Sequence, residues 1–355
     1  MKIIYYVTDH GYGHGVRTAT IVNALPAATH IVFRTTLPEA FFHEVVRRKF
    51  TYASAAFDCG CIQKDGIRSN IEATLVAYRD IAKRNEKLFD REAAWCRAQY
   101  PTLIVSDIVP FAFEVAQACG IPSVAVTNFT WYDIYKKYCA NFPAYGPLLG
   151  PLQQQYASAS MLLSLDPALP MHYFPVRTKI ALVGRQGRKR RGDIVQHYKL
   201  DSAKHIGLLY MGQLGIEGFD WQAIERFSDW EFLGISTADS LPANYRRVGK
   251  IDFPYQDLVA SVDCMVGKLG YSTVAEAMLH GTPMIYLPRD DFAEFEVLDA
   301  AVRQWGGGVC LTTKAFTKCE WREALDRSIA WRRRPLPIKS DGAEHAAACI
   351  VHLAS

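Results

Sequence analysis

The sequence predicts a protein of the α/β class with two doubly wound domains, and three observations support this. A length of 355 residues with 50% hydrophobic residues is sufficient for two buried cores. Short apolar runs rich in Val, Ile and Tyr alternate with longer amphipathic stretches, which is typical of βαβ units around a parallel sheet. A proline-rich segment at 142–191 separates two such series.

Hydrophobic periodicity locates the elements of the first half. Apolar runs predict strands at 3–7, 30–34, 103–106 and 123–128. Apolar residues near helical spacing, with Arg, Lys and Glu on the other face, predict a long helix at 71–99. The first run is interrupted by Asp9 and His10, so it lacks the long apolar core of a secretory signal. We therefore predict that it is a strand.

Prolines and charges mark the boundary between the domains. Six prolines between 142 and 191 precede the basic run RQGRKRR at 185–191, a pattern of turn formers and like charges. Further strands are predicted at 206–211, 231–233, 264–266 and 284–287. We predict a first domain at 1–175, a second at 176–335, and a last helical segment at 336–355 that can pack back on the first domain.

The composition excludes two classes of protein. A net charge of +4, from 40 basic and 36 acidic residues, is too small and too evenly spread for a nucleic-acid binder and fits a small anionic ligand better. The most apolar later stretch, 103–129, is broken by charged residues and prolines, so it lacks the ~20 consecutive apolar residues of a transmembrane helix. We predict no nucleic-acid partner and no transmembrane segment.

The cysteine pattern is that of a reduced protein. Nine cysteines, an odd number without CxxC pairs, are typical of cytosolic thiols rather than of a disulfide framework. The one close pair, Cys59 and Cys61, has no nearby His or third Cys and makes a poor zinc site. We therefore predict free, partly buried thiols, a cytoplasmic location and no metal site.

A glycine-rich loop with two histidines, DHGYGHG at 9–15, follows the first strand directly. Glycines let the backbone turn sharply and bring a helix N-terminus to the strand ends, where open α/β sheets bind ligands. A helix is expected at 18–25, and His14 near its start is a candidate base at neutral pH. His10 and Tyr12 are candidates for contact with the acceptor, the molecule from which such a base would remove a proton. The alternative for His10 is a side chain that fixes the turn by hydrogen bonds.

The second half has two comparable loops, YMGQLG at 210–215 after a strand and KLGYSTVAEA at 268–277 at a helix start. Hydroxyls and free backbone N–H groups at a helix N-terminus attract phosphate oxygens, so these loops predict a diphosphate site. An acidic cluster that suits sugar hydroxyls follows the last predicted strand, at Asp290, Asp291, Glu294 and Glu296. The alternative for this cluster is a solvated helix start, where acidic residues are favoured.

These motifs resemble those of GT-B glycosyltransferases, particularly plant-type UDP-glycosyltransferases and the bacterial peptidoglycan-precursor N-acetylglucosaminyltransferase. The most detailed resemblance is to the glycosyltransferase-like N-terminal domain of plant L-arabinokinase. It is carried by YYVTDHGYGHGVRT, LIVSDIVPFAFEVAQACGIPSVAVTNFTW and KLGYSTVAEAMLHGTPMIYLPRDDFAEFE. The resemblance implies a GT-B fold, in which two Rossmann-like domains face each other across a cleft. The first would bind the acceptor and the second the nucleotide sugar.

In the first domain, the resemblance places His14 on the histidine of the family's Gly-His step, the general base toward the acceptor hydroxyl. Asp107 matches the carboxylate that steadies this histidine in many relatives. The alternative for Asp107 is a cap of the following helix. Asn128, Trp131 and Tyr135 match the lining of an acceptor pocket, for which the alternative is ordinary aromatic packing.

In the second domain, the resemblance implies a donor site. The residues that it assigns are Gly212, Gly215, Lys268, Gly270, Tyr271, Ser272 and Thr273 at the diphosphate, Ile251 and Phe253 at the base, Glu276 at the ribose, and Asp291 and Glu294 at the sugar. The sequence departs from the plant pattern at Lys268, where a histidine is common, and it lacks the Asp-Gln pair. The identity of the donor therefore stays open.

The resemblance implies an inverting, metal-independent and cofactor-free glycosyltransferase that moves a sugar, expected from a UDP-sugar, to an acceptor hydroxyl. A non-catalytic nucleotide-sugar sensor or scaffold and a GT-B-type nucleotide-sugar epimerase stay open as alternatives. The acceptor is expected to be a small molecule or lipid-linked. We expect the basic run 185–191 to be a solvated linker, with contact to the diphosphate or to an anionic membrane surface as alternatives.

Overall fold

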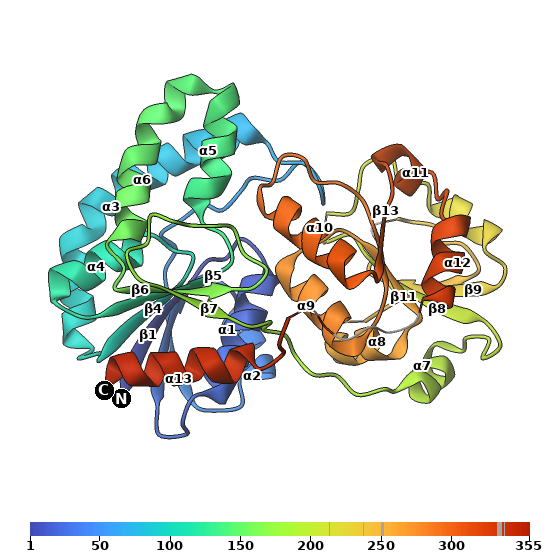
Figure 1. Ribbon diagram of the computed structural model, residues 1–355, viewed down its shortest axis with the longest axis horizontal. Coiled ribbons are helices and arrows are strands. Elements are labelled where there is room, and N and C mark those ends of the chain that lie inside the picture. Colours follow the sequence, from blue (N-terminus) through green and yellow to red (C-terminus); the bar gives the residue numbers. More distant parts are fainter. Residues whose placement is uncertain (213, 237, 250–251, 332–335, 337) are drawn as a thin grey trace.

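The computed structural model describes residues 1–212, 214–236, 238–249, 252–331, 336 and 338–355. It has two α/β domains side by side (Figure 1). The first contains a seven-stranded sheet in the order β3-β2-β1-β4-β5-β6-β7, in which every neighbouring pair is parallel. Its strands are β1 (Lys2–Val7), β2 (His30–Thr35), β3 (Phe50–Ser54), β4 (Leu103–Asp107), β5 (Ser123–Thr127), β6 (Met161–Leu165) and β7 (Arg177–Ile180). Helices cover both faces, which explains why β4 and β5 are buried along their whole length.

Local sequence determines where several helices of this domain begin. The Asn70 side chain accepts a hydrogen bond from the Ala73 backbone N–H at the start of the longest helix. Thr130 and Asp133 form a capping box at another. The helices are α1 (Tyr12–Ala24), α2 (Glu39–Val45), α3 (Ile71–Ala98), α4 (Phe111–Cys119), α5 (Trp131–Asn141), the 3₁₀ helix η1 (Pro143–Leu148) and α6 (Leu149–Ala157).

The second domain repeats the architecture with six strands in the order β10-β9-β8-β11-β12-β13, also parallel throughout. The strands are β8 (His205–Tyr210), β9 (Trp230–Gly234), β10 (Tyr245–Arg247), β11 (Cys264–Gly267), β12 (Met284–Tyr286) and β13 (Gly308–Cys310). The helices are α7 (Arg191–Tyr198), the 3₁₀ helix η2 (Trp221–Arg226), α8 (Tyr255–Ser261), α9 (Tyr271–His280), α10 (Glu294–Trp305), α11 (Thr313–Thr317) and α12 (Arg322–Ala330).

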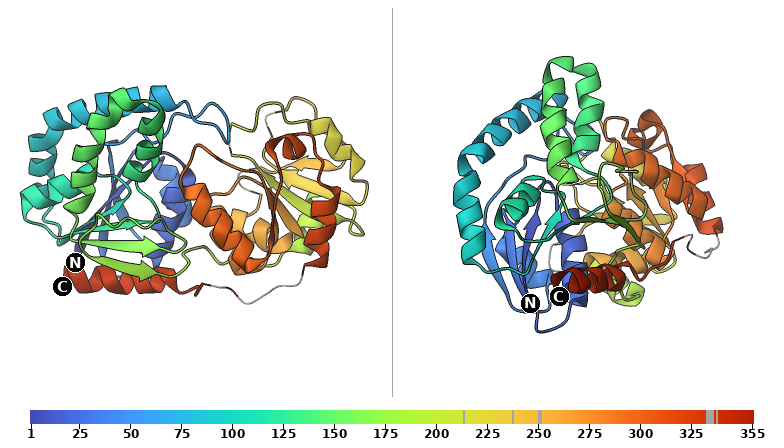
Figure 2. Two further views of the ribbon diagram at one scale, coloured as in Figure 1. Left: turned by 45° about the horizontal axis from the view of Figure 1, so that its top comes forward. Right: turned by 60° about the vertical axis from the view of Figure 1, so that its left-hand side comes forward.

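The last helix, α13 (Gly342–Ala354), belongs spatially to the first domain. It packs against α1 and β7, and it buries Ala346, Ala347 and Ile350. Both views in Figure 2 show it along the first domain, with the two chain ends close together. The chain therefore crosses between the domains twice.

Each sheet reverses its strand order at one point, and these two points face each other. In the first sheet the reversal lies between β1 and β4, and in the second it lies between β8 and β11. Ligands of open α/β sheets bind outside the carboxyl ends of the strands at such reversals. The predicted catalytic loop follows β1, and the predicted diphosphate loops follow β8 and β11.

The two domains are in direct contact at these ends. Ser272 Oγ at the start of α9 donates a hydrogen bond to the Gly13 carbonyl in α1, over 2.9 Å. The Gly66 backbone N–H donates to the Gly215 carbonyl, over 2.6 Å. The largest apolar cluster also includes buried residues of both domains. The structure is therefore a closed arrangement.

The structure confirms two doubly wound parallel domains and corrects several predicted details. The sequence reading missed β3, β6, β7, β10 and β13. The first sheet continues to Ile180, beyond residue 175, and α1 begins at Tyr12 rather than at 18. All nine cysteines are free thiols. No helix in the described part of the chain is both long enough and apolar enough to cross a bilayer.

Candidate active site

The centre of the first domain's site is a hydrogen-bonded pair, His14 and Asp107. His14 lies in the first turn of α1, just after β1, and Asp107 is the last residue of β4. Val7 pairs in register with Asp107, so the carboxylate and the start of α1 meet at the same sheet edge. His14 Nδ1 lies 2.7 Å from Asp107 Oδ1. The structure thus brings the two predicted catalytic residues together.

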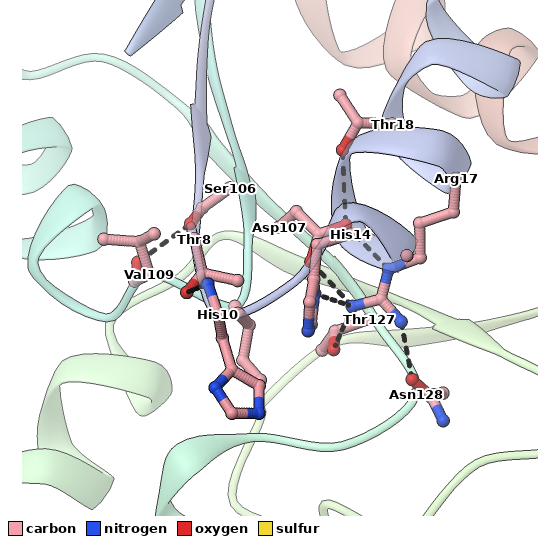
Figure 3. Close-up of polar contacts among 12 residues, drawn as sticks. Thr8, His10, His14, Arg17, Thr18, Ser106, Asp107, Val109, Thr127 and Asn128 are labelled. Carbon is pink, nitrogen blue, oxygen red and sulfur yellow. Dashed lines mark hydrogen bonds and ion pairs between the residues drawn. The ribbon is translucent and has the colours of Figure 1, made fainter. Parts of the chain in front are cut away.

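Arg17, which the sequence analysis did not assign to the site, completes this pair. Its Nε lies 2.7 Å from Asp107 Oδ2 and its Nη2 lies 2.6 Å from Oδ1, a bidentate contact. Thr18 Oγ1 donates to the same carboxylate, over 3.2 Å. Figure 3 shows the side chains of His14, Arg17 and Thr18 converging on Asp107. A signal was available, because His14 and Arg17 are three residues apart and share one helix face.

The charges around Asp107 determine the tautomer of His14. Burial raises the pKa of the Asp107 carboxyl, but the opposing effects of Arg17 and His14 dominate and lower it to about 2. Asp107 is therefore an anion that only accepts hydrogen bonds, so its 2.7 Å contact with His14 Nδ1 places the hydrogen on that nitrogen. Arg17 Nη2 also lies 3.0 Å from Nδ1, but it donates to Asp107 Oδ1 over the shorter distance of 2.6 Å. When this ring is unprotonated, Nε2 has a free lone pair, and among the described residues it has no hydrogen-bond partner. An imidazole in this state can act as a general base.

His10 has a different environment from His14. Its Nδ1 accepts a hydrogen bond from the Cys61 backbone N–H over 3.1 Å, and its ring meets Trp131 edge-on with centroids 5.1 Å apart. Burial lowers the pKa of His10 well below its usual value, and the charges of His14, Arg289 and Lys268 lower it further. Figure 3 shows its ring pointing away from the cluster at Asp107. The His10 ring therefore links this loop to the segment at Cys61.

The residues predicted to line an acceptor pocket do not form an open one in this arrangement. Tyr12 is exposed, whereas Asn128, Trp131 and Tyr135 are fully buried. Trp131 Nε1 donates to Asp58 over 2.7 Å, and the Tyr135 hydroxyl donates to the Gly60 carbonyl over 2.6 Å. Both rings therefore pack in the core. Asn128 bridges the domains instead, as described below.

Asp58 is a buried polar residue that the sequence reading missed. It accepts hydrogen bonds from Thr8 Oγ1 and from Trp131 Nε1, and burial raises its pKa to about 7. Asp58 lies in the segment after β3, and because that strand was not predicted, nothing placed the residue at the carboxyl edge of the sheet.

The second domain presents the N-terminus of α9 to this site. Gly270 caps the helix without a side-chain hydrogen bond, and the first turn contains no acidic residue. Tyr271 accepts a hydrogen bond from the Val183 N–H, and the Arg17 guanidinium lies 5.6 Å from the centre of its ring. Ser272 contacts Gly13, so the start of α9 lies next to the loop that holds His14. Free backbone N–H groups in this position suit an anion.

Lys268 and Gly212 lie beside this helix end. Gly212 has φ of 77°, a left-handed conformation that favours glycine, and a side chain there would meet the Lys268 Nζ about 3.2 Å away. Burial and the nearby Arg289 lower the pKa of Lys268 to about 8, against the opposing effect of Glu294. The loops after β8 and β11 thus bring together a glycine turn, an ammonium group and a helix N-terminus. Gly215 lies further along, where its carbonyl contacts Gly66.

The predicted ribose contact, Glu276, is buried and paired. Its Oε1 accepts a hydrogen bond from Arg185 Nε over 2.5 Å. Among the described residues, no other side chain or backbone group donates to this carboxylate. The Arg185 pair therefore holds Glu276 in one orientation and leaves Oε2 for a ligand.

The predicted sugar contacts take part in the domain interface. Asp291 Oδ2 accepts from the Ser69 backbone N–H over 2.6 Å, and Glu294 Oε1 accepts from Asn128 Nδ2 over 2.8 Å. Because Asn128 also accepts from Arg17, a chain of hydrogen bonds links Asp107 to Glu294 across the interface. Two members of the predicted acidic cluster are therefore anchored groups rather than a solvated helix start.

Of the two predicted base contacts, only Phe253 lies within the described residues. Phe253 is buried against α7, where the Arg190 guanidinium lies 4.8 Å from the centre of its ring. Ile251 lies outside the described residues.

The basic run 185–191 is not the solvated linker that we expected. Its backbone N–H groups donate to side chains of the second domain, from Gly187 to His280, from Arg188 to Asp257 and from Arg190 to Ser261. The run is therefore bound along α8 and α9. The physical reason is that buried or half-buried acceptors on these helices satisfy its backbone donors.

Comparison with known proteins agrees with this architecture. No protein-family model matches the chain. Over 332 residues, 92% of this chain, it is 29% identical to L-arabinokinase of Arabidopsis thaliana, although it spans only 32% of that protein's length.

Solved structures match over the whole chain. The glycotransferase of kitacinnamycin superposes with a TM-score of 0.69 at 15% identity, covering 100% of this chain and 99% of that one. UGT89C1 of Arabidopsis thaliana, solved with UDP, superposes with a TM-score of 0.63 at 13% identity, covering 100% and 99%. The chain therefore has the GT-B fold of glycosyltransferases, with two Rossmann-like domains whose sheets meet at their carboxyl ends.

Proposed function

We propose that this protein is an inverting glycosyltransferase that transfers a sugar from a nucleotide diphosphate, expected to be UDP, to an acceptor hydroxyl without a metal ion. The observation that carries the proposal is the hydrogen bond between Ser272 and Gly13, which sets the free N-terminus of α9 beside the His14 loop. A base and an anion site thus face each other across one gap. A displacement at a sugar carbon needs this arrangement.

The proposed reaction has one displacement. His14 Nε2 takes the proton of the acceptor hydroxyl, and the oxygen forms a bond to the anomeric carbon as the bond to the diphosphate oxygen breaks. Asp107 stabilises the imidazolium that results, as the carboxylate does in a Ser-His-Asp triad. Attack from the face opposite the nucleotide inverts the anomeric configuration.

The departing diphosphate gains negative charge, and fixed groups of the second domain can stabilise it. The first turn of α9 supplies backbone N–H groups, and Lys268 supplies a positive charge. In the described part of the chain, no three His, Cys, Asp or Glu side chains are grouped so that they could hold a metal ion. Support for UDP comes from the structural neighbour that was solved with it.

Calorimetric titration with UDP, dTDP and GDP in the presence of a chelator tests the donor site. We expect wild type to bind one of them, Glu276→Ala to lose about tenfold or more in affinity through the ribose contact, and His14→Ala to bind as wild type does. Glu323→Ala, an exposed carboxylate on α12, is the matched control. If wild type binds none of the three nucleotides, the donor-site assignment is wrong.

Nuclear magnetic resonance of the sugar product tests the reaction itself. Release of the inverted anomer, slowed by about a hundredfold or more in His14→Ala, supports base-catalysed transfer. An epimerised free sugar formed without acceptor would instead indicate an epimerase, and nucleotide binding without any turnover would indicate a sensor or scaffold.

A further inference from the structure

Arg289, just after β12, is a buried cation without hydrogen-bond partners for two of its nitrogens. Its exposed fraction is 7%, and neither Nε nor Nη2 has a partner in the described structure. Asp291 Oδ1 forms an ion pair with Nε over 3.8 Å, beyond hydrogen-bond distance, so neither atom has a hydrogen-bond partner. Burying unpaired N–H groups of a charged side chain is costly, so a ligand that pairs with them would be bound with a clear gain.

Arg289 lies near both halves of the proposed active site. Its guanidinium carbon lies 3.9 Å from the centre of the Phe292 ring, and this ring is nearly parallel to that of His10, with centroids 6.2 Å apart. Arg289 is also close enough to Lys268 to lower the pKa of that ammonium group. The guanidinium therefore lies near both the catalytic loop and the proposed diphosphate site.

The unpaired atoms have a specific geometry. Nε and Nη2 form one edge of the guanidinium plane, and their N–H groups point the same way. Such an edge matches two oxygens of one carboxylate or phosphate group. A sugar hydroxyl can accept from only one of the two N–H groups and leaves the other unpaired.

We propose that Arg289 recognises an oxyanion of the nucleotide sugar through its Nε–Nη2 edge. This inference rests on the proposed function and adds a residue that decides which donor is accepted. The oxyanion has two candidate sources, which are an oxygen pair of the diphosphate and a carboxylate on the sugar, as in a nucleotide-linked uronic acid. Lys268 and the start of α9 already face the diphosphate, which leaves Arg289 for the sugar end.

Titration of three ligands into matched variants separates these sources. The ligands are UDP, UDP-glucose and UDP-glucuronate, and the variants are wild type, Arg289→Gln and Arg327→Gln. Arg327 is an exposed arginine of α12 in the same domain, so its substitution makes the same change in charge away from the site (Figure 1). We expect Arg327→Gln to bind every ligand as wild type does.

If the oxyanion is a carboxylate on the sugar, we expect wild type to bind UDP-glucuronate more tightly than UDP-glucose. Arg289→Gln should then weaken the binding of UDP-glucuronate alone, by about ten- to a hundredfold. If the oxyanion belongs to the diphosphate, Arg289→Gln should weaken the binding of all three ligands by a similar factor. Arg289→Lys keeps the positive charge but lacks the paired N–H groups of the guanidinium. It is the test variant if Arg289→Gln does not fold, and we expect it to bind the nucleotides more weakly than wild type does.

Two outcomes overturn the inference in distinguishable ways. If wild type binds these nucleotides and the Arg289 variants stay within about twofold of it, Arg289 is not a recognition residue, while the proposed function stands. If wild type binds none of the three ligands, the proposed donor site and this inference both fail.

Discussion

Asp107 is the residue on which the candidate base depends. It is fully buried, and its two oxygens take hydrogen bonds from His14, Arg17 and Thr18. Without Arg17 the burial of the carboxylate would favour its protonated form, which no longer holds His14 in the tautomer with a free Nε2. Arg17 is therefore a positioning residue for the base, although it has no contact with the reacting atoms in the proposed mechanism.

This pairing predicts a pH-dependent contribution of Asp107 to stability. Its pKa is about 2 in the folded chain, against an ordinary value of 3.8. The unfolded chain therefore binds the proton first as the pH falls, so a stabilisation of about 2 kcal/mol is present above about pH 4 and is lost between about pH 4 and 2. Urea unfolding of wild type and Asp107→Asn at several pH values measures it.

We expect the stability difference between these two proteins to shrink by about 2 kcal/mol between about pH 4 and 2. Asp90→Asn, which removes an exposed carboxylate of α3, should change stability little at any of these pH values. A difference between wild type and Asp107→Asn that is unchanged at pH 2 would contradict the prediction.

At the residue scale, the sequence identified the candidate catalytic residues, but it did not show which nearby aromatic residues pack in the core. The glycine-rich loop after the first strand predicted His14, and the family resemblance predicted Asp107. Trp131 and Tyr135 were expected in a pocket, yet their polar atoms find partners inside the first domain. Aromatic residues near a site have the same sequence pattern in either case, so only the fold distinguishes them.

At the element scale, the central strands were predicted, whereas the four edge strands and the interior strand β6 were missed. The strands β1, β4 and β5 are apolar runs because both of their faces are buried. In contrast, β10 has three residues and β7 reads RTKI, so neither has a clear hydrophobic pattern.

The start of α1 was placed too late for a related reason. Glycines at 13 and 15 lower helix propensity, yet tertiary packing requires the one at 15. A side chain on Gly15 would overlap the Phe41 ring, and one on Gly13 would contact Ser272. The helix therefore includes residues of low helix propensity because neighbouring elements pack closely against it, and the sequence alone does not show this packing.

The return of α13 to the first domain leads to an element-scale prediction. Ile350 is fully buried where α13 packs near α1 and β7. Ile350→Ala removes three carbon atoms from a packed core, so we expect a loss of about 2 to 4 kcal/mol in the free energy of unfolding. His352→Ala, an exposed position on the same helix, should cost less than about 0.5 kcal/mol. Denaturant unfolding of both variants measures this, and equal losses would show that α13 does not stabilise the domain.

At the scale of the whole molecule, the two domains were predicted but their closure was not. The segment 65–69 of the first domain reaches the second, where Gly66 and Ser69 donate backbone hydrogen bonds and Arg68 pairs with Glu217. Asn128 and Glu294 add a buried contact beside the catalytic cluster. These contacts join residues more than a hundred positions apart, and no periodicity in the sequence reports on such pairs.

Because the segment 65–69 joins the two domains, a methyl group added at Gly66 should affect how closely they approach each other. A Cβ there would overlap the carbonyl oxygens of Met211 and Gly215, both in the second domain. Gly66→Ala should therefore hold the domains apart, and since His14 and the start of α9 lie on opposite domains, we expect turnover to fall by about ten- to a hundredfold. Glu276 and Lys268 both belong to the second domain, so nucleotide affinity should change less than about threefold.

Small-angle X-ray scattering and steady-state kinetics on the same samples test this prediction. The radius of gyration of Gly66→Ala should exceed that of wild type. Gly146→Ala, in η1, is the matched control, because a Cβ at that position meets no atom within 4 Å. If Gly66→Ala keeps both the radius of gyration and the turnover of wild type, the contact at Gly66 does not control closure. If it opens the molecule without slowing transfer, the reaction does not need His14 and α9 to meet, and the mechanism proposed for this site is wrong.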